Sequence, residues 1–531
     1  MQIPHDPPYG SRRSPVLAEN IVATSQPLAA QAGLAMLARG GNAVDAAIAA
    51  AAVLTVVEPS GNGLGSDAFA ILWDGTALHG LNASGAAPQG WTPERFAGLT
   101  EMPFHGWEAV TVPGAVSAWA ALADRFGTMP LKTLVEPAAR YAEVGFIVSP
   151  VIGALWRRAE TQLIDKPGFA DALLPGGKAP RAGQRFANPA QAASLRAIGQ
   201  SNGAAFYTGA LAEKIAGFAA QHGAALTMDD LAAHRPEWVT PLAAGFDHTD
   251  LHEIPPNGQG IAALMALGML EHTGIRALDP DSPAALHLQI EAIKLAFADL
   301  DAFVADERAM TDVTPAALLD ASYLAERASH IDPTRAGNPG AGAPRHGGTV
   351  YLTAADASGM MVSFIQSNYA GFGSGVVVPE TGISLQNRGA GFTLTPGHPN
   401  QVAPGKRPFH TIIPGFMTQA GAPVSSFGVM GGPMQAQGHV QMVLRTRLWG
   451  QDPQTAIDAP RWRFVEGRNV AVETALPQAT QAALAELGHV LSVEPPDNAF
   501  GFGGAQMITR LAGGGYIAGS DPRKDGCAVG F

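Results

Sequence analysis

The sequence has little cysteine and no concentration of positive charge. Cys527 is the single cysteine among 531 residues, which excludes an internal disulfide framework, a CxxC redox centre and a thiolate zinc site. Lys and Arg number 33 against 45 Asp and Glu, so the formal net charge is −12. Because there is also no basic run, this balance argues against a nucleic-acid groove and an anionic membrane surface.

Long apolar runs are missing as well. The first twenty residues are polar and proline-rich and hold no core of a signal peptide. The longest apolar stretch, Ala46–Val57, is too short to cross a bilayer and indicates a buried helix instead. We therefore expect a soluble, cytoplasmic protein.

Most common catalytic signatures are also absent. The sequence has no P-loop, no GxSxG elbow and no HExxH. The glycines in GNGLG, residues 61–65, lack the preceding strand and following helix of a dinucleotide site. His248 and His252 lie four apart in a segment that alternates like a strand, which would put both on one face. No third ligand is nearby, so a solvated or core role is favoured over metal binding. Cys527 is interpreted as a small buried filler rather than a nucleophile.

The chain divides into a helical half, a flexible loop and a β-rich half. Residues 113–330 are expected to be mainly helical, and residues 332–348 form a Gly/Pro-rich loop that we expect to be exposed. Further expected elements are the helices Ala29–Leu37, Asn42–Val57 and Gln478–Leu487, the strand Ala68–Trp73, and the strands Thr349–Ala355 and Met360–Gln366 joined by a turn.

The junction after the loop suggests a chemistry. Thr349 opens an expected core strand directly after a loop that looks cleavable. A threonine hydroxyl is a weak nucleophile unless a base lies beside it. If the bond before Thr349 is cut, its own α-amino group, with an ordinary pKa near ~8, supplies that base.

Several separated motifs carry a resemblance over about 95% of the chain, from Val22 onward. They are PLAAQAGLAMLARGGNAVDAAIAAA, VTVPGAVSAWAALADRFGTMPL, TVYLTAADASGMMVSFIQSNYAGFGSGV, GKRPFHTIIP, VMGGP and GSDPRKDG. In order and spacing, the sequence resembles the γ-glutamyltransferase (glutathione hydrolase) family of N-terminal-nucleophile hydrolases. GLGSDAF, IQSNYAGFGSG and LQNRGAGF together look like a γ-glutamyltransferase-like subgroup in which one activity is oxamate amidohydrolase.

The resemblance implies a fold and a mechanism. The fold would be an α+β, αββα sandwich, cut between Gly348 and Thr349 into a large subunit, 1–348, and a small subunit, 349–531, that stay associated as one domain. Thr349 matches the nucleophile, Gly431 and Gly432 match the oxyanion glycines, and Ser367 matches a hydroxyl residue that hydrogen-bonds the nucleophile. Backbone N–H groups of glycine suit an oxyanion because nothing blocks close approach. No metal or organic cofactor is implied.

The positions that would grip a γ-glutamyl group differ from the family pattern. Ser84 stands where the family has an arginine for the α-carboxylate, Tyr369 where it has an asparagine, and Gly391 where an aspartate holds the α-ammonium. His410-Thr411 replaces paired serines, and the loop His398–Lys406, a lid in some members, looks short.

One cation remains among the substrate-binding candidates. These candidates are Tyr369, Asn387, Arg388, His410 and Thr411. Charge-assisted contacts are each worth about 1.5–3 kcal/mol, so losing both anchors of a zwitterion weakens its binding substantially. We hypothesise that Arg388 binds a substrate carboxylate and that the substrate needs no α-amine; a structural salt bridge is the equal alternative for Arg388.

Three functions stay open from the sequence. The family substrate would be a γ-glutamyl compound such as glutathione, hydrolysed or transferred. The alternative is a small carboxylate-bearing amide such as oxamate, hydrolysed to oxalate and ammonia. The third is an unprocessed, non-catalytic binding protein. A small-molecule substrate is expected in the enzymatic cases, with no nucleic-acid or membrane partner, and a homo-oligomer is left open.

Overall fold

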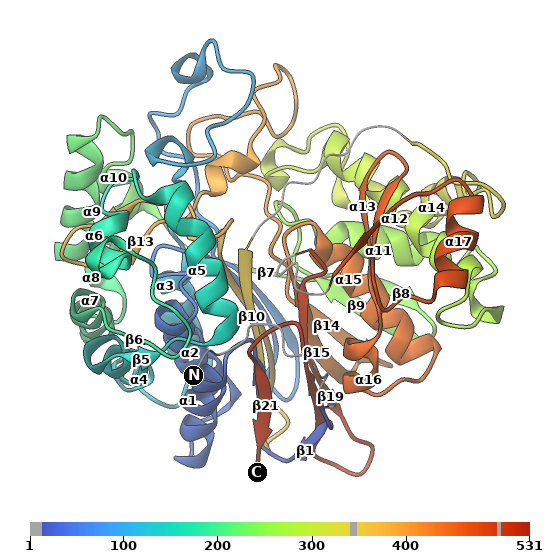
Figure 1. Ribbon diagram of the computed structural model, residues 1–531, viewed down its shortest axis with the longest axis horizontal. Coiled ribbons are helices and arrows are strands. Elements are labelled where there is room, and N and C mark those ends of the chain that lie inside the picture. Colours follow the sequence, from blue (N-terminus) through green and yellow to red (C-terminus); the bar gives the residue numbers. More distant parts are fainter. Residues whose placement is uncertain (1–12, 340–347, 496–500) are drawn as a thin grey trace.

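Two large sheets form the centre of the molecule, as the computed structural model of residues 13–339, 348–495 and 501–531 shows (Figure 1). One sheet has the order β1 (Val16–Ala18), β20 (Tyr516–Ser520), β19 (Gly504–Arg510), β15 (Ala422–Met430), β14 (Gly415–Gln419), β9 (Thr249–Glu253) and β8 (Leu242–Phe246). The other has the order β21 (Cys527–Gly530), β2 (Ile21–Thr24), β10 (Gly348–Ala355), β11 (Met361–Tyr369), β3 (Asp67–Trp73), β4 (Leu78–Asn82) and β7 (Glu237–Val239).

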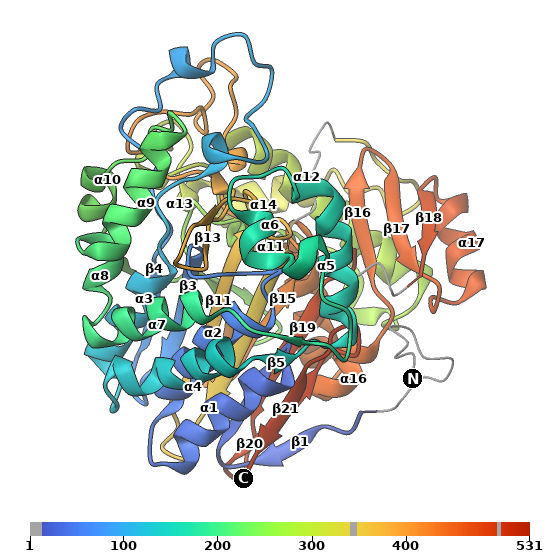
Figure 2. The same ribbon diagram turned by 60° about the vertical axis from the view of Figure 1, so that its left-hand side comes forward.

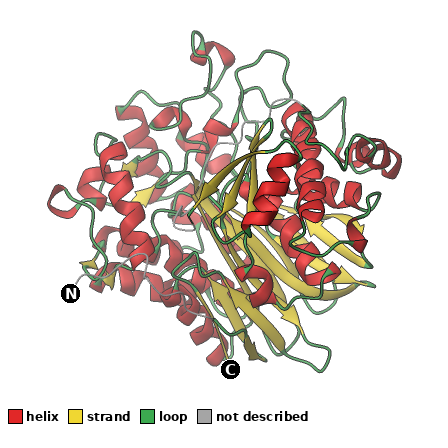
Figure 3. Ribbon diagram, turned by 45° about the vertical axis from the view of Figure 1, so that its right-hand side comes forward, coloured by secondary structure: helices red, strands yellow, loops and turns green. Residues whose placement is uncertain are grey.

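Helices cover the outer face of each sheet, giving the expected αββα order (Figure 3). On the side of β10 and β11 lie α1 (Pro27–Ala38), α2 (Ala43–Val57), α3 (Ala115–Phe126), α4 (Leu131–Val144), α5 (Pro150–Leu163), α7 (Pro189–Gln200) and α9 (Ala210–Gln221). On the side of β14 and β15 lie α11 (Gly260–Leu270), α12 (Pro283–Phe303), α14 (Ala321–Ala328), α15 (Met434–Val443) and α16 (Pro453–Asp458). A three-stranded sheet of β16 (Trp462–Glu466), β17 (Asn469–Glu473) and β18 (Val490–Glu494), with α17 (Gln478–Glu486), lies outside this second layer (Figure 2).

Apolar side chains fill the space between the sheets. Phe69, Tyr351 and Ile365 from one sheet form a buried cluster with Phe416 and Met430 from the other. Helix α2 is buried along its whole length, as its Ala-rich sequence predicts, and an Asn42–Asp45 capping box fixes its start.

The two halves of the sequence are interleaved in the sheet that holds Thr349. Strands β10 and β11 pair with each other, and β2 and β3 from before residue 340 pair with their outer edges. Because backbone hydrogen bonds join the halves on both sides, a cut before Thr349 would leave the sheet intact.

Two loops, one containing residues 91–102 and the other residues 392–406, lie together at the top of the molecule in Figure 1. They share a small apolar cluster, in which Trp91, Phe96 and Met102 of one loop join Phe392 and Val402 of the other. The segment that looked short in the sequence, His398–Lys406, belongs to the second loop. It is tied to the first by the Ala87 N–H, which donates to the Lys406 carbonyl at 2.8 Å.

Some expectations from the sequence need correction or fall outside the described residues. His248 lies in the turn before β9 with φ 63°, so it does not share a strand face with His252. Cys527 is half-buried in β21 rather than fully buried. Residues 332–335 are exposed as expected, but Ala336 is buried and Gly337 is half-buried; residues 340–347 of the same loop lie outside the described residues. Among the described residues, no helix combines the length and apolarity that a membrane span requires.

Candidate active site

Thr349 is the second residue of β10 and lies in an irregular stretch of the β10–β11 ladder. The ladder shifts register between Gly348, opposite Tyr369, and Val350, opposite Gln366. The Thr349 side chain is buried, and its Oγ1 donates to Ser367 Oγ at 3.3 Å while accepting from Gln435 Nε2 at 3.2 Å. The hydroxyl is therefore held from two sides, as a nucleophile must be.

The turn between β15 and α15 brings Gly431 and Gly432 to the same region. Their φ angles are 121° and 61°, which only glycine adopts readily. The Gly432 carbonyl accepts from Gln259 Nε2 at 2.8 Å, whereas neither glycine N–H donates a hydrogen bond to any described residue. The N–H groups of Gly431 and Gly432 therefore remain available close to Gln435, whose side chain contacts Thr349. This arrangement suits an oxyanion site.

Arg388 is fully buried, at the start of the short helix η6 (Arg388–Gly391). Its Nη1 donates to Thr411 Oγ1 at 3.0 Å, and its guanidinium carbon lies 4.9 Å from the centre of the Tyr369 ring. Nε and Nη2 have no hydrogen-bond partner among the described residues. Burial lowers the Arg388 pKa to about 10, so the group stays charged near neutral pH. A buried cation with unused donors is suited to a carboxylate ligand.

A chain of contacts joins these parts into one site. From Thr349 it runs through Ser367 to Tyr369, whose N–H donates to Ser367 Oγ at 2.7 Å, and then to the Arg388 guanidinium beneath the Tyr369 ring. Thr411 continues it, because Gln259 Nε2 bridges the carbonyls of Thr411 and Gly432. Three contacts thus lead from Thr349 to Arg388, and three more lead from Arg388 through Thr411 and Gln259 to Gly432.

Asp67 and His410 lie beside this chain of contacts. Asp67 pairs with Ser367 across the β3–β11 ladder, and its Oδ2 is 3.1 Å from His410 Nε2, with both side chains fully buried. Burial raises the Asp67 pKa to about 7 and holds the His410 pKa well below its ordinary value. The pair is therefore uncharged below pH 7, when Arg388 is the uncompensated charge.

Other residues singled out in the sequence have structural partners. Asn387 donates to the Phe104 carbonyl at 2.9 Å and accepts from the Ala370 N–H at 3.1 Å, which leaves little capacity for a ligand. Ser84 bonds Asn82 at 2.7 Å. A Cβ at Gly391 would lie 2.5 Å from the Phe409 carbonyl oxygen, so this backbone has no room for an aspartate there.

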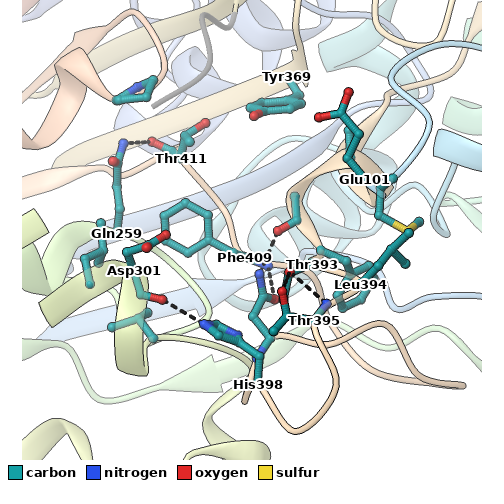
Figure 4. Close-up of a pocket in the computed structure, with 18 of the residues that line it drawn as sticks. Glu101, Gln259, Asp301, Tyr369, Thr393, Leu394, Thr395, His398, Phe409 and Thr411 are labelled. Atoms are coloured by element: carbon teal, nitrogen blue, oxygen red, sulfur yellow. Dashed lines mark hydrogen bonds between the residues drawn. The ribbon is translucent and has the colours of Figure 1, made fainter. Parts of the chain in front are cut away.

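A cavity of about 370 Å³ opens from the site toward the two top loops (Figure 4). Gln259, Tyr369, Thr411 and Pro433 form its inner end, next to the oxyanion turn and Arg388. The lining also includes Glu101, Asp301, Thr393, Leu394, Thr395, His398 and Phe409, which are labelled in the same view.

Gln435, Gln259 and Asp67 were missed as site residues in the sequence. A weak signal existed for Gln435, because it follows the VMGGP turn by two residues and therefore falls in the first turn of α15. Gln259 and Asp67 reach the site only through pairing between distant segments.

Comparisons with known proteins agree with this geometry. Residues 29–531 match the family model described as gamma-glutamyltranspeptidase. The "Glutathione hydrolase-like YwrD proenzyme" of Bacillus subtilis is 36% identical over 98% of this chain and 100% of its own. The "Oxamate amidohydrolase proenzyme" of Klebsiella pneumoniae is 38% identical over 95% of this chain and 97% of its own.

A solved structure extends the agreement to the fold. The cephalosporin acylase from Bacillus halodurans superposes with a TM-score of 0.95 and 46% identity, covering 100% of this chain and 99% of that one. The N-terminal-nucleophile sandwich inferred from the motifs is thereby confirmed.

Proposed function

The chain belongs to the γ-glutamyltranspeptidase family of autoprocessing amidohydrolases, and we propose that it cuts itself before Thr349 and hydrolyses amides whose acyl half ends in a carboxylate and carries no α-ammonium. The observation that carries the substrate proposal is the buried Arg388, with Nε and Nη2 unpartnered among the described residues.

Maturation is proposed to begin from the continuous strand β10, in which Gly348 and Thr349 are still joined. Thr349 Oγ1 attacks the Gly348 carbonyl carbon, the peptide C–N bond breaks, and the nitrogen gains a proton, leaving an ester. Water then cleaves the ester to a Gly348 carboxylate and a Thr349 that carries a free hydroxyl and amine. The contacts of Thr349 with Ser367 and Gln435 support this order, because they hold Oγ1 in place before the amine exists.

Turnover is proposed to use the new amine as the base. The Thr349 amine accepts the Oγ1 proton as Oγ1 attacks the substrate carbonyl, and the oxyanion is bound by the free N–H groups of Gly431 and Gly432. The amine half leaves with a proton, and water hydrolyses the acyl ester. Removing one oxyanion donor typically costs about 10²–10³-fold in kcat.

The preference for an acyl half with a carboxylate and without an α-ammonium follows from the two positions that would hold these groups, Arg388 and Gly391. Arg388 offers its buried donors to a carboxylate, whereas Gly391 leaves no room for the aspartate that would hold an α-ammonium. This combination favours plain dicarboxylic half-amides, of which oxamate is the smallest, over γ-glutamyl compounds. The likeness to the oxamate amidohydrolase proenzyme supports the same preference.

Two anilides that differ in a single group test the substrate class. Glutaryl-4-nitroanilide and γ-glutamyl-4-nitroanilide have the same chain length and leaving group, and only the second carries an α-ammonium. We expect kcat/KM to be at least about 10-fold higher for the glutaryl compound, since one charged group without a partner costs over ~1.4 kcal/mol. A higher kcat/KM for the γ-glutamyl compound would contradict the proposed substrate class and indicate a γ-glutamyl substrate instead.

The proposal also predicts a pH dependence of binding. The Asp67 pKa is raised to about 7, so its carboxyl group is neutral at pH 6 and ionised at pH 8. The added negative charge opposes a substrate carboxylate at Arg388, so KM for a glutaryl amide should rise about 3- to 10-fold between these pH values, or roughly 1 kcal/mol. Asp67→Asn should remove most of the rise; an equal rise in both proteins would contradict the role given to Asp67.

A further inference from the structure

The amide of Gln435 faces the Thr349 hydroxyl in a single orientation. The Gln435 side chain is fully buried in the first turn of α15. Its Oε1 accepts from the Ile413 N–H at 3.0 Å, and its Nε2 lies 3.2 Å from Thr349 Oγ1. Because a backbone N–H only donates, the carbonyl oxygen of the amide must face Ile413. The NH₂ group therefore faces Thr349, and Oγ1 accepts a hydrogen bond from it.

The helix that carries Gln435 is fixed to the neighbouring strands one turn further on. His439 Nδ1 lies 2.5 Å from Glu253 Oε1, at the end of β9, and both side chains are fully buried. The His439 ring also packs against Phe427 of β15, with the ring centres 4.8 Å apart. Gln435 is thus held by the Ile413 backbone at one end and by an anchored helix at the other, so its N–H group is preorganised toward Oγ1.

The two hydrogen bonds of Oγ1 run in opposite directions. Oγ1 donates to Ser367 Oγ at 3.3 Å and accepts from Gln435. As Oγ1 attacks a carbonyl carbon, it passes its proton to the base, and partial negative charge develops on the oxygen. The same oxygen leaves when water cleaves the acyl ester: the C–Oγ1 bond breaks, Oγ1 takes the electron pair, and the Thr349 amine returns the proton. An N–H group aimed at Oγ1 stabilises its charge in both steps.

We propose that Gln435 is a further catalytic residue, whose Nε2–H stabilises the Thr349 oxygen in attack and in departure, separately from the N–H groups of Gly431 and Gly432 that bind the substrate oxyanion. The inference rests on the proposed function only for Thr349 as nucleophile. It is independent of the substrate class, because the amide bonds Thr349 and Ile413. The contact exists in the uncut chain, so the same N–H group also acts in maturation.

Gln435→Met tests whether the amide takes part in the reaction. The apolar side chain has a similar length and no donor, so kcat per processed chain should fall about 100-fold, as for other donors to a developing charge. Processing before Thr349 should slow as well. Intact mass gives the processed fraction, and glutaryl-4-nitroanilide gives kcat. A kcat within about 3-fold of wild type would overturn the proposal.

Gln435→Glu separates the donor from a purely structural role. It keeps the shape of the side chain and an acceptor for the Ile413 N–H, and its buried carboxyl group donates to Oγ1 only while protonated. At about pH 6 its kcat should exceed that of Gln435→Met about 10-fold. Its ratio to wild type, in which groups that titrate in both proteins cancel, should then fall at least about 5-fold by about pH 8.5. A ratio that stays flat over this interval would overturn the proposal.

Gln437→Glu is the matched control on the same helix. Gln437 is also a buried glutamine, but its Oε1 accepts from the Phe464 N–H at 2.7 Å and its Nε2 donates to the Phe464 carbonyl at 3.2 Å, on β16. The variant should keep kcat within about 3-fold of wild type at both pH values. If it reproduces the pH trend of Gln435→Glu, the trend comes from a charge in α15 and the proposal is wrong.

Failure of the inference is distinguishable from failure of the proposed function. If glutaryl-4-nitroanilide is not cleaved, the substrate class is wrong, and the same variants are compared with γ-glutamyl-4-nitroanilide, because Gln435 acts on the nucleophile. If Thr349→Ala still matures or hydrolyses amides, the nucleophile itself is wrong, and the role of Gln435 is rejected with it. If Thr349 is required and Gln435→Met keeps its kcat, only the inference is rejected.

Discussion

Thr349→Ala is expected to remain one uncut chain of 54.8 kDa and to hydrolyse no amide. Two losses coincide in this variant, because Oγ1 is the attacking atom both in maturation and in turnover. Removal of a nucleophile from an established hydrolase costs about 10⁶-fold in kcat, so activity should fall below detection. A denaturing gel and an anilide assay measure the two losses separately.

Controls for this variant lie in the same strand and at the same position. Thr353→Ala removes another buried hydroxyl of β10, one that contacts Ser426 Oγ at 2.6 Å on a strand of the other sheet, and it should be processed normally. Thr349→Ser keeps a hydroxyl and should still be cut, more slowly. A Thr349→Ala protein that divides into two subunits would show that another residue performs the cleavage.

Arg388→Met is expected to raise KM for a dicarboxylic half-amide by about 10- to 100-fold, the equivalent of about 1.4–2.7 kcal/mol. The guanidinium is buried with Nε and Nη2 unpartnered among the described residues, so a neutral side chain of similar length should be tolerated by the fold. The change should fall mainly on KM, since Arg388 contacts neither Thr349 nor the glycine turn directly.

The substrate charge provides the control for Arg388. The wild-type enzyme should prefer glutaryl-4-nitroanilide to its methyl ester, and Arg388→Met should reduce this preference toward unity. If acid and ester keep their wild-type ratio in the variant, Arg388 does not bind the carboxylate and serves as a structural charge.

Local patterns predicted the elements around the site. The Ala-rich run before Val57 has a helical start signal at Asn42, and it folds as the fully buried α2. The turn 356–359 joins two strands as its Asp and Gly residues predict. The expected second strand ended at Gln366, one residue short of Ser367, so the contact of Thr349 with Ser367 was anticipated from the family resemblance and not from the hairpin pattern.

Contacts between distant segments could not be anticipated in this way. Gln259 reaches Gly432 from the start of α11, and Asp67 reaches His410 from another strand of the sheet. Neither residue has a local pattern, because its role depends on which surfaces the layers bring together. Asn387 shows the opposite error: its neighbour in sequence, Arg388, has free donors, but the Asn387 amide is used by Phe104 and Ala370.

The intact mass of the purified protein tests the central claim most directly. The account predicts two chains, residues 1–348 and 349–531, and, after rapid acid quench with a glutaryl amide, a glutaryl adduct on the N-terminal Thr349 of the smaller chain. A preparation that hydrolyses the amide as a single uncut chain, or an adduct mapped to any other residue, would contradict it.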